Sequence, residues 1–181
     1  TQVRASAGDP RLGGEDFVQA MATLVRAKAG LPADEEHPVP EQLWHRLEMA
    51  KRELSAQEAV EVVFDADQPP VRVTRAEYEA ACAPLLQRLR QPMERALRDA
   101  QITPQELDEV VLVGGATRMP MVRRMLAQLF QRLPLRTINP DETVARGAAV
   151  YAGMLANDEQ LQDVVLTDVM PFSLGIITSN A

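Results

Sequence analysis

The stretch VVLVGGATRMP, residues 110–120, places a double glycine directly after a run of four apolar residues. Gly114 and Gly115 have no Cβ atoms, so the chain can turn sharply there and leave backbone N–H groups facing outward. Pro120 suits the first turn of a following helix, whose positive end attracts phosphate or ribose oxygens. Arg118 adds a planar cation beside these donors. The pattern indicates either a nucleotide-binding corner or a strand-to-helix turn without a ligand.

A stripe of four polar residues lies on a helix predicted over residues 41–54, at positions i, i+3, i+4 and i+7: Glu48, Lys51, Arg52 and Ser55. The stripe runs beside the leucine face of this helix, so it could line a cleft with an acceptor, two cations and a hydroxyl. The alternative is a solvated face with a Glu48–Arg52 ion pair worth about 0.3–0.5 kcal/mol.

The stretch INPDETVARGAAVYAGML, residues 138–155, opens with a helix-start pattern, with Asn139 as a cap, Pro140 next and Glu142 three residues after the cap. Asp141 lies at the mouth of this helix, where it could accept a hydrogen bond from a ligand or merely complement the helix dipole. A stripe of small residues follows and predicts close packing of the helix against a neighbour: Ala145, Ala148, Ala149 and Ala152.

Other chemistry-bearing residues lack suitable partners. His37 and His45 have no cysteine or second histidine at ligand spacing, and Asp65 and Asp67 lie in a predicted turn. We therefore expect neither a metal site nor an acid/base pair. Cys82 is the single cysteine and lies at helical spacing among apolar residues, which excludes an internal disulfide and predicts a buried, inert thiol.

Charge and hydropathy narrow the class of protein. A formal net charge of -7 at pH 7 argues against nucleic acid or an anionic membrane as the principal partner. No apolar run approaches the roughly 20 residues of a spanning helix, so we expect a soluble protein. The chain starts with Thr1, and TQVRAS resembles the middle of a strand, so we also expect an excised piece of a longer protein.

Apolar periodicity predicts the elements that position these residues. Thr74 and Glu77 form a capping-box pattern at one helix start, and Pro92 is expected to mark a break near the start of the next helix. Residues 30–40 contain three prolines and predict an exposed connection. The expected elements in this part are helices over 14–29, 41–54 and 75–90 and a hairpin with strands at 60–64 and 71–73.

The last third alternates strand and helix and predicts an α/β arrangement, with a sheet covered on at least one face. Even with a further strand over residues 2–6 this sheet is thin, so we expect strands before Thr1 to complete it in the parent protein. The expected elements here are strands over 110–113 and 135–138 and helices over 119–131 and 141–156.

Five stretches together resemble the DnaK-type seventy-kilodalton heat-shock chaperones, in order and in spacing: AGDPRLGGEDF, EMAKRELS, VVLVGGATRMP, INPDETVARGAAVYAG and DVVLTDVMPFSLGI. The resemblance covers essentially all 181 residues. The first and last stretches look most like the specialised bacterial member HscC. A chance match of five motifs in register is very improbable, whereas any one motif alone would be modest evidence.

This resemblance implies an actin-like ATPase domain, of which the chain would be the second lobe. By the family's organisation, residues 1–11 would be a strand of the inner subdomain and residues 12–101 the outer mobile subdomain, an α+β unit with helices and a hairpin. Residues 102–161 would form the partial α/β inner subdomain. Residues 162–181 would be the interdomain linker and the start of the substrate-binding domain.

The resemblance also implies a nucleotide site. The helix stripe matches the family's adenosine-binding helix, the double glycine matches its nucleotide-contacting loop, and Arg52 and Arg118 would lie on opposite faces of the adenine. Ala116 stands where the family usually has serine, which removes one hydroxyl contact. The residues implied for nucleotide binding are Glu48, Lys51, Arg52, Ser55, Gly114, Gly115, Arg118 and Asp141.

The same resemblance has implications for ATP hydrolysis and for the linker that couples the two domains. The family's phosphate loops, catalytic lysine and glutamate and magnesium-positioning aspartates would precede Thr1, so this piece should bind ATP or ADP weakly or not at all and should not hydrolyse ATP. Magnesium would be bound in the full-length parent. The linker would be carried by Val164, Val165 and Leu166, with Thr167 in place of a usual leucine.

The implied partners are those of the parent: a nucleotide exchange factor that grasps the outer subdomain, a J-domain co-chaperone and unfolded client polypeptides, in the cytoplasm. A second hypothesis is a non-catalytic actin-fold module that only docks partners, with the polar stripe as a solvated face. A sugar or acetate kinase of the same superfamily is disfavoured, because the linker and the SLG stretch would have no purpose there.

Overall fold

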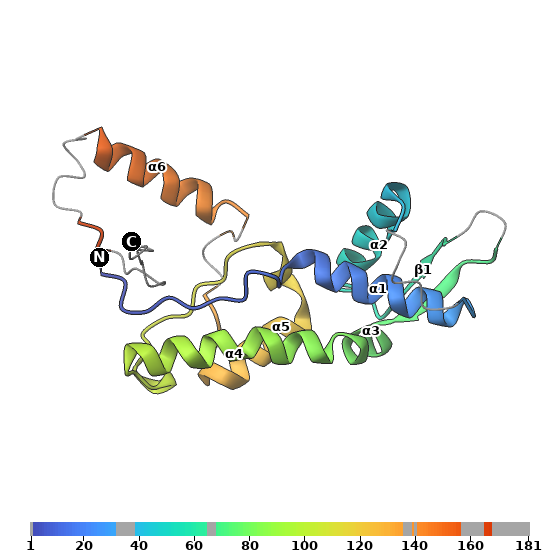
Figure 1. The fold of residues 1–181 in the computed structure, drawn as a ribbon, viewed down its shortest axis with the longest axis horizontal. Helices are drawn as coiled ribbons and strands as arrows, with labels where there is room; N and C mark the ends of the chain where they lie inside the picture. The colour runs from blue at the N-terminus through green and yellow to red at the C-terminus, as the bar shows by residue number, and fades with distance from the viewer. Residues whose placement is uncertain are drawn as a thin grey trace, which may run out of the picture.

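A computed structural model describes residues 2–31, 39–64, 68–135, 139, 141–156 and 165–167. The chain is elongated: helices and a hairpin form one end, two further helices run along the middle, and a last helix stands apart (Figure 1). The elements are α1 (Gly14–Lys28), α2 (Glu41–Glu53), β1 (Ala59–Val62), β2 (Val71–Thr74), α3 (Arg75–Ala81), α4 (Ala83–Ala100), η1 (Pro104–Glu106), η2 (Gly115–Arg118), α5 (Pro120–Phe130) and α6 (Thr143–Leu155).

The core lies mainly between α1, α2 and the hairpin. Glu15 and Asp16 occupy the first turn of α1, where carboxylates complement the helix dipole. Apolar residues recur every three or four positions in α1 and α2, so each helix buries one face. The buried side chains of these two helices are Phe17, Val18, Met21, Ala22, Val25, Leu43, Leu47 and Ala50, together with Lys51. The predicted helices over 14–29 and 41–54 are confirmed within a residue.

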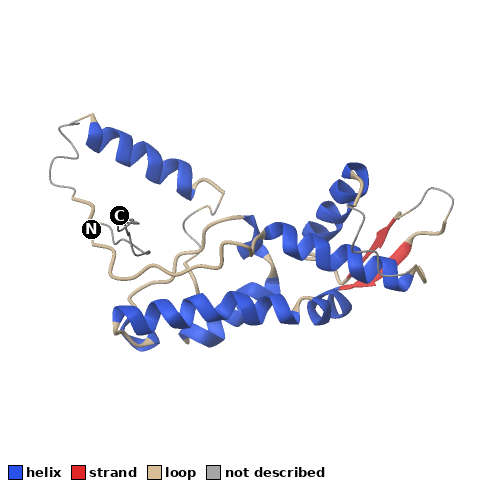
Figure 2. Ribbon diagram, viewed as in Figure 1, coloured by secondary structure: helices blue, strands red, loops and turns tan. Residues whose placement is uncertain are grey.

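The hairpin β1–β2 is antiparallel, and its register pairs Val60 with Val73 and Glu61 with Arg72. Side chains alternate between the two faces of a strand, so the valine pair is buried while the charged pair is exposed. Figure 2 shows the two strands beside the helices at one end of the molecule. Within the described residues, β1 and β2 form the single sheet.

The break between the helices α3 and α4 lies at Cys82, and the expectation of a break at Pro92 is wrong. Pro92 lies inside α4, where its missing N–H removes one helical hydrogen bond without ending the helix. The capping box at the start of α3 is present, because the Thr74 hydroxyl accepts from the backbone N–H of Glu77. Cys82 is fully buried, as predicted, and burial raises the pKa of its thiol to about 11.

The strands expected over 110–113 and 2–6 do not form. Val110 accepts one backbone bond, from Leu135 at 2.9 Å, and Gln2 makes an isolated parallel bridge with Thr167. A strand requires a ladder of such bonds with a neighbouring strand, and neither segment has one among the residues described. The expected strand over 135–138 begins at Leu135, which is in a loop, and its remaining residues lie outside the described part.

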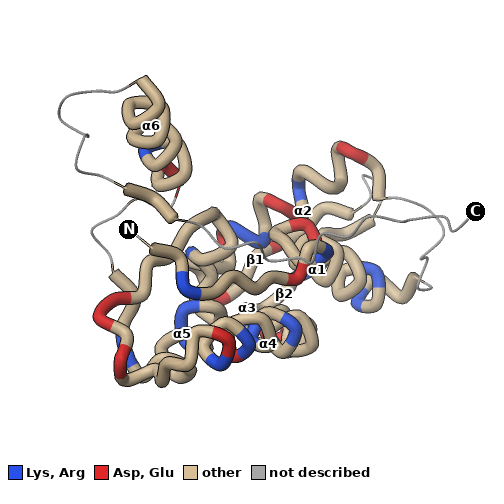
Figure 3. Tube along the Cα trace, turned by 60° about the vertical axis from the view of Figure 1, so that its left-hand side comes forward, with Lys and Arg blue, Asp and Glu red and all other residues tan. Residues whose placement is uncertain are grey.

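The close packing expected of the last helix is also not observed. α6 begins at Thr143, two residues later than predicted, and none of its residues is buried. Val144 and Leu155 are 68% and 69% exposed. Figure 3 shows that this helix carries few charged positions, so most of its exposed residues are uncharged. The small-residue stripe is exposed for the same reason, since no described element lies against it: Ala145, Ala148, Ala149 and Ala152.

Candidate functional site

One cavity of about 830 Å³ is lined by all eight residues that the sequence implicates in nucleotide binding. It lies between α2, the start of α1 and the loop that carries η2. The lining residues from the prediction are Glu48, Lys51, Arg52, Ser55, Gly114, Gly115, Arg118 and Asp141. The sequence separation between the two arginines is large, so their meeting in one cavity is a property of the tertiary structure.

Helix α2 presents a buried cation and its acceptors to this cavity. Lys51 is 7% exposed, and its Nζ donates to the backbone oxygen of Gly14 at 3.2 Å and to Glu48 Oε2 at 3.3 Å. Partial burial of Glu48 opposes its ionisation, but the charges and hydrogen bonds of Lys51 and Arg52 outweigh that effect and lower its pKa. Glu48 is therefore an ionised acceptor at neutral pH.

Arg52 lies on the exposed side of the same helix. Its Nε donates to Glu48 Oε1 at 3.0 Å, and its Nη2 lies 2.9 Å from the same oxygen. The ion pair that the sequence offered as the alternative to a binding role is thus present. Ser55 follows the helix end and donates its backbone N–H to the Arg52 oxygen, which places the serine in the cavity wall.

The double glycine lines the same cavity from the loop that carries η2. Gly114 has a φ of 89°, a conformation that residues with a Cβ rarely adopt, and it precedes the short helix η2. The Thr117 hydroxyl donates to the Gly114 oxygen at 2.7 Å, so it closes the turn. Ala116 lines the cavity and supplies no hydroxyl.

Arg118 is held by two residues that precede the last helix, α6. Its Nη2 donates to Asp141 Oδ2 at 2.5 Å and to Asn139 Oδ1 at 3.3 Å. Asn139 does not act as the helix cap that the sequence predicts; its Oδ1 instead also accepts from the backbone N–H of Asp141, while its backbone oxygen accepts from Thr143 Oγ1. Each cavity arginine is therefore paired with a carboxylate.

Sequence reasoning missed several lining residues, notably Gly14 and Glu15. The sequence of this stretch predicts a helix start, and α1 does begin at Gly14. The signal that could have found them is the preceding Gly13, because two adjacent glycines allow a close approach of backbone to ligand. The other missed residues are Val113 and Met119.

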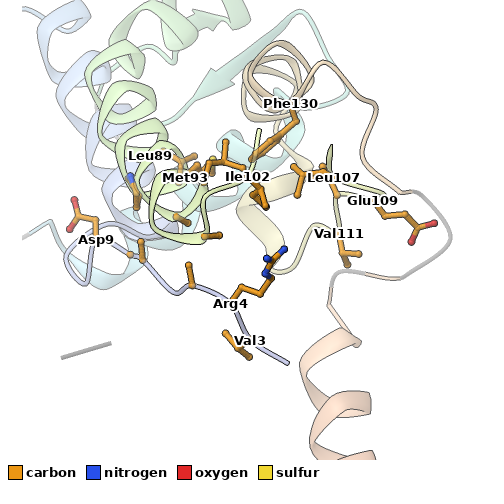
Figure 4. Close-up of a pocket in the computed structure, with 18 of the residues that line it drawn as sticks. Val3, Arg4, Asp9, Leu89, Met93, Ile102, Leu107, Glu109, Val111 and Phe130 are labelled. Atoms are coloured by element: carbon orange, nitrogen blue, oxygen red, sulfur yellow. The ribbon is translucent and has the colours of Figure 1, made fainter. Parts of the chain in front are cut away.

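A second cavity, of about 730 Å³, is mainly apolar (Figure 4). It lies between the N-terminal segment, the helix α4 and residues 107–111. Leu89, Met93 and Phe130 are among its lining side chains, and Val3 and Val111 lie at its edges. The segments that the sequence assigns to strands therefore border an apolar cavity.

Two further features, a metal-binding cluster and a membrane-spanning helix, are not found among the described residues. Among them, no group of three or more His, Cys, Asp or Glu side chains is placed to hold a metal ion. Within the same residues, no helix has the length and apolar character needed to cross a membrane. Of the predicted linker residues, Val165 and Leu166 are 65% and 47% exposed, and Val164 lies outside the described part.

Comparison with known proteins assigns the family. The model of the Hsp70 protein family matches residues 1–181. The chain is 41% identical over 189 residues to the chaperone protein dnaK3 of Synechococcus elongatus, covering 98% of this chain and 25% of that protein. It is 40% identical over 191 residues to the chaperone protein DnaK of Thermus thermophilus, covering 98% of this chain and 31% of that protein.

A third relative is the chaperone protein HscA of Yersinia pseudotuberculosis, 41% identical over 177 residues, with 98% of this chain and 27% of that protein covered. The chain thus belongs to the Hsp70 family and spans between a quarter and a third of the length of these relatives. Membership implies an actin-like ATPase fold, and the mixed helical structure with one small sheet is consistent with part of such a fold.

Proposed function

We propose that this chain is part of the nucleotide-binding domain of an ATP-dependent chaperone and carries the adenosine-binding half of the nucleotide cleft. The observation that supports this most directly is the single cavity shared by the polar stripe of α2 and the double-glycine loop. These two features lie about 60 residues apart in the sequence, and a solvated stripe and a turn without a ligand would have no reason to line one cavity.

The chemistry of the cavity suits an adenine nucleotide. Two guanidinium planes, from Arg52 and Arg118, can each stack on a purine, which is a planar and polarisable ring. Lys51, Glu48 and Ser55 offer donors and an acceptor to ribose hydroxyls. We propose ATP or ADP as the ligand, and the lack of a cavity hydroxyl at Ala116 as one reason for weak binding.

The domain assignment is part of the same proposal. Residues 12–101 would be the outer subdomain, which offers a surface to a nucleotide exchange factor, and residues 102–161 the inner subdomain. In the whole protein, further strands beside residues 1–11 would cover the apolar cavity of Figure 4. Residues 162–181 would link to a substrate-binding domain for unfolded polypeptides, and a J-domain co-chaperone would act on the whole protein.

We assign ATP hydrolysis to the whole protein and not to this chain alone. The family's phosphate loops, catalytic lysine and magnesium-positioning aspartates have no counterpart among the motifs matched here. We therefore propose that the chain itself does not hydrolyse ATP and that magnesium binds elsewhere in the whole protein. From the family resemblance, we also propose that this protein is cytoplasmic. The similarity of the N- and C-terminal motifs to those of an HscC-like member is likewise a prediction.

Calorimetric titration with ADP tests the pocket assignment. Arg52→Ala should raise the dissociation constant about three- to thirtyfold, the range expected for loss of one cation–π contact. Arg90→Ala is the matched control, because Arg90 also forms an i,i+4 pair, with Glu94 on α4, and lies outside the cavity. Tight ADP binding that Arg52→Ala leaves unchanged would contradict the assignment.

An actin-fold module that only docks partners is the second candidate. The carboxylate partners of Arg52 and Arg118 favour it, because both guanidinium groups already have counter-ions. ATP turnover by the full-length protein decides between the two: measurable hydrolysis supports the chaperone ATPase, and its absence, together with no ADP binding by the chain, supports the docking module.

A further inference from the structure

A short turn, residues 9–12, lies between the N-terminal residues that line the apolar cavity and the start of α1. The turn is closed locally, because Asp9 Oδ1 accepts from the backbone N–H of Arg11 at 2.9 Å and the Asp9 backbone oxygen accepts from Leu12 at 3.2 Å. Asp9 and Leu12 also line the apolar cavity. The chain then passes directly into Gly14 and Glu15, which line the proposed nucleotide cavity.

A single side chain from α4 binds this turn at two points. Arg88 donates from Nε and Nη2 to Asp9 Oδ2, at 3.2 and 2.8 Å, and from Nη2 to the Arg11 backbone oxygen at 3.2 Å. The planar guanidinium fork fixes both the carboxylate and the backbone of the turn. The same contacts lower the pKa of Asp9, after the larger effect of its bond from the Arg11 N–H.

The turn is connected to the buried cation of the nucleotide cavity. The Gly14 oxygen accepts from Lys51 Nζ at 3.2 Å, and the Gly13 N–H donates to Asp16 Oδ2 at 2.7 Å. A buried ammonium needs its hydrogen-bond acceptors in place, because an unmatched buried charge is costly. A displaced turn would remove one of the two acceptors that the structure gives Lys51, leaving Glu48.

We propose that the Arg88–Asp9 ion pair positions the Gly14 carbonyl and, through it, the ammonium of Lys51 in the nucleotide cavity. Arg88 and Asp9 are positioning residues, since neither lines that cavity. The inference rests on the proposed function for its ligand, but the placement of the turn does not. An ordinary surface ion pair would hold nothing else in place.

The single tryptophan provides a reporter of the turn that needs no ligand. Trp44 of α2 lines a shallow cavity together with Pro10, Arg11 and Leu12. If Arg88 holds the turn, Arg88→Met should increase quenching of Trp44 fluorescence by acrylamide, and Asp9→Asn should do the same. Asp9→Asn keeps an oxygen for the Arg11 N–H, so it removes the charge and not the turn bond.

Binding measurements then test the step to Lys51. Arg88→Met and Asp9→Asn should each raise the dissociation constant for ADP about two- to fivefold, the range for a partly exposed ion pair. The double variant should lose no more than either single variant, and Arg88→Met should have no added effect when Lys51 is already methionine. Arg95→Met is the control, because Arg95 pairs with Asp99 on the same helix.

The outcomes separate the two proposals. Unchanged Trp44 quenching in Arg88→Met overturns the positioning role, whether or not the chain binds ADP. Increased quenching with an unchanged ADP dissociation constant, or an equal loss in the Lys51→Met background, overturns the link to the cavity. No ADP binding by the unsubstituted chain would instead count against the proposed function, while the quenching arm still decides whether Arg88 positions the turn.

Discussion

Lys51 is the one charged residue that is buried among those described, and its surroundings explain how the charge is tolerated. Two acceptors, the Gly14 oxygen and the Glu48 carboxylate, lie within hydrogen-bond distance of its ammonium. A compact ammonium fits such a position better than a guanidinium fork, which needs acceptors for five N–H groups. The lysine therefore connects the packing of α1 against α2 with the proposed ligand cavity.

A second residue with a defined electrostatic role is Glu77. Its carboxylate bonds to Lys28 at 2.5 Å, to the Thr74 backbone N–H at 2.8 Å and to the Thr74 hydroxyl at 2.7 Å. The bond from Lys28, followed by those from Thr74, lowers the pKa of Glu77 from 4.5 to about 2. The ionised form is therefore favoured by folding.

The sign of the pH dependence follows from this depressed pKa. The stabilisation is complete above the unfolded pKa, near 4.5, and is lost as the pH falls through the folded value of about 2. Glu77→Gln should therefore be less stable than the unsubstituted chain at pH 7, and the difference should shrink as the pH falls from 4.5 toward 2. Urea unfolding at a series of pH values measures this; a difference that is independent of pH would contradict it.

At the scale of elements, α3 is attached to α1 by one buried polar contact. Tyr78 is 2% exposed, and its hydroxyl donates to the Phe17 backbone oxygen at 2.8 Å. That oxygen belongs to the first half of α1. Burial also raises the pKa of Tyr78, which favours the protonated hydroxyl that donates this bond.

Removal of this hydroxyl should loosen the contact between the two helices. Tyr78→Phe should lower the free energy of unfolding by about 1 kcal/mol, because one hydrogen bond in the core is lost. Chemical denaturation checks the value. The chain offers a matched control in Tyr151→Phe, since Tyr151 is 50% exposed on α6 and should show no change. Equal effects of the two substitutions would show that the buried bond contributes nothing.

The elements also show which helix ends local sequence can predict. The capping box of Thr74 and Glu77 uses residues three apart, so the start of α3 was predictable. Pro92 gave a misleading signal because a proline weakens a helix without always ending it. Its ring lies against the apolar cavity, a contact made with segments distant in the sequence.

At the scale of the whole molecule, stability is distributed unevenly. The α1, α2 and hairpin region holds most of the buried side chains. Val111 and Val113 are 44% and 42% exposed, in a segment that lacks a strand partner among the residues described. Regions with few buried contacts open at low free energy.

Amide hydrogen exchange should report this difference. The amides of Val18, Met21 and Val25 in α1 should exchange slowly, close to the rate set by global unfolding, and those of Val111 and Val113 should exchange quickly. In a longer protein with further strands in place, the two fast amides should become protected. Equal protection of both groups in this chain would contradict the uneven distribution.

The sequence by itself determined the helices α1, α2 and α5, the hairpin, the buried thiol of Cys82 and the two polar motifs, because these depend on local periodicity, turn chemistry and recognisable motifs. The tertiary structure alone decided the absent strands, the exposure of α6, the burial of Lys51 and the pairing of Arg88 with Asp9. The contacts of Lys51 and Arg88 join residues 37 and 79 positions apart, and a strand or a packed helix needs a neighbouring element; such long-range contacts leave no periodic pattern in the sequence.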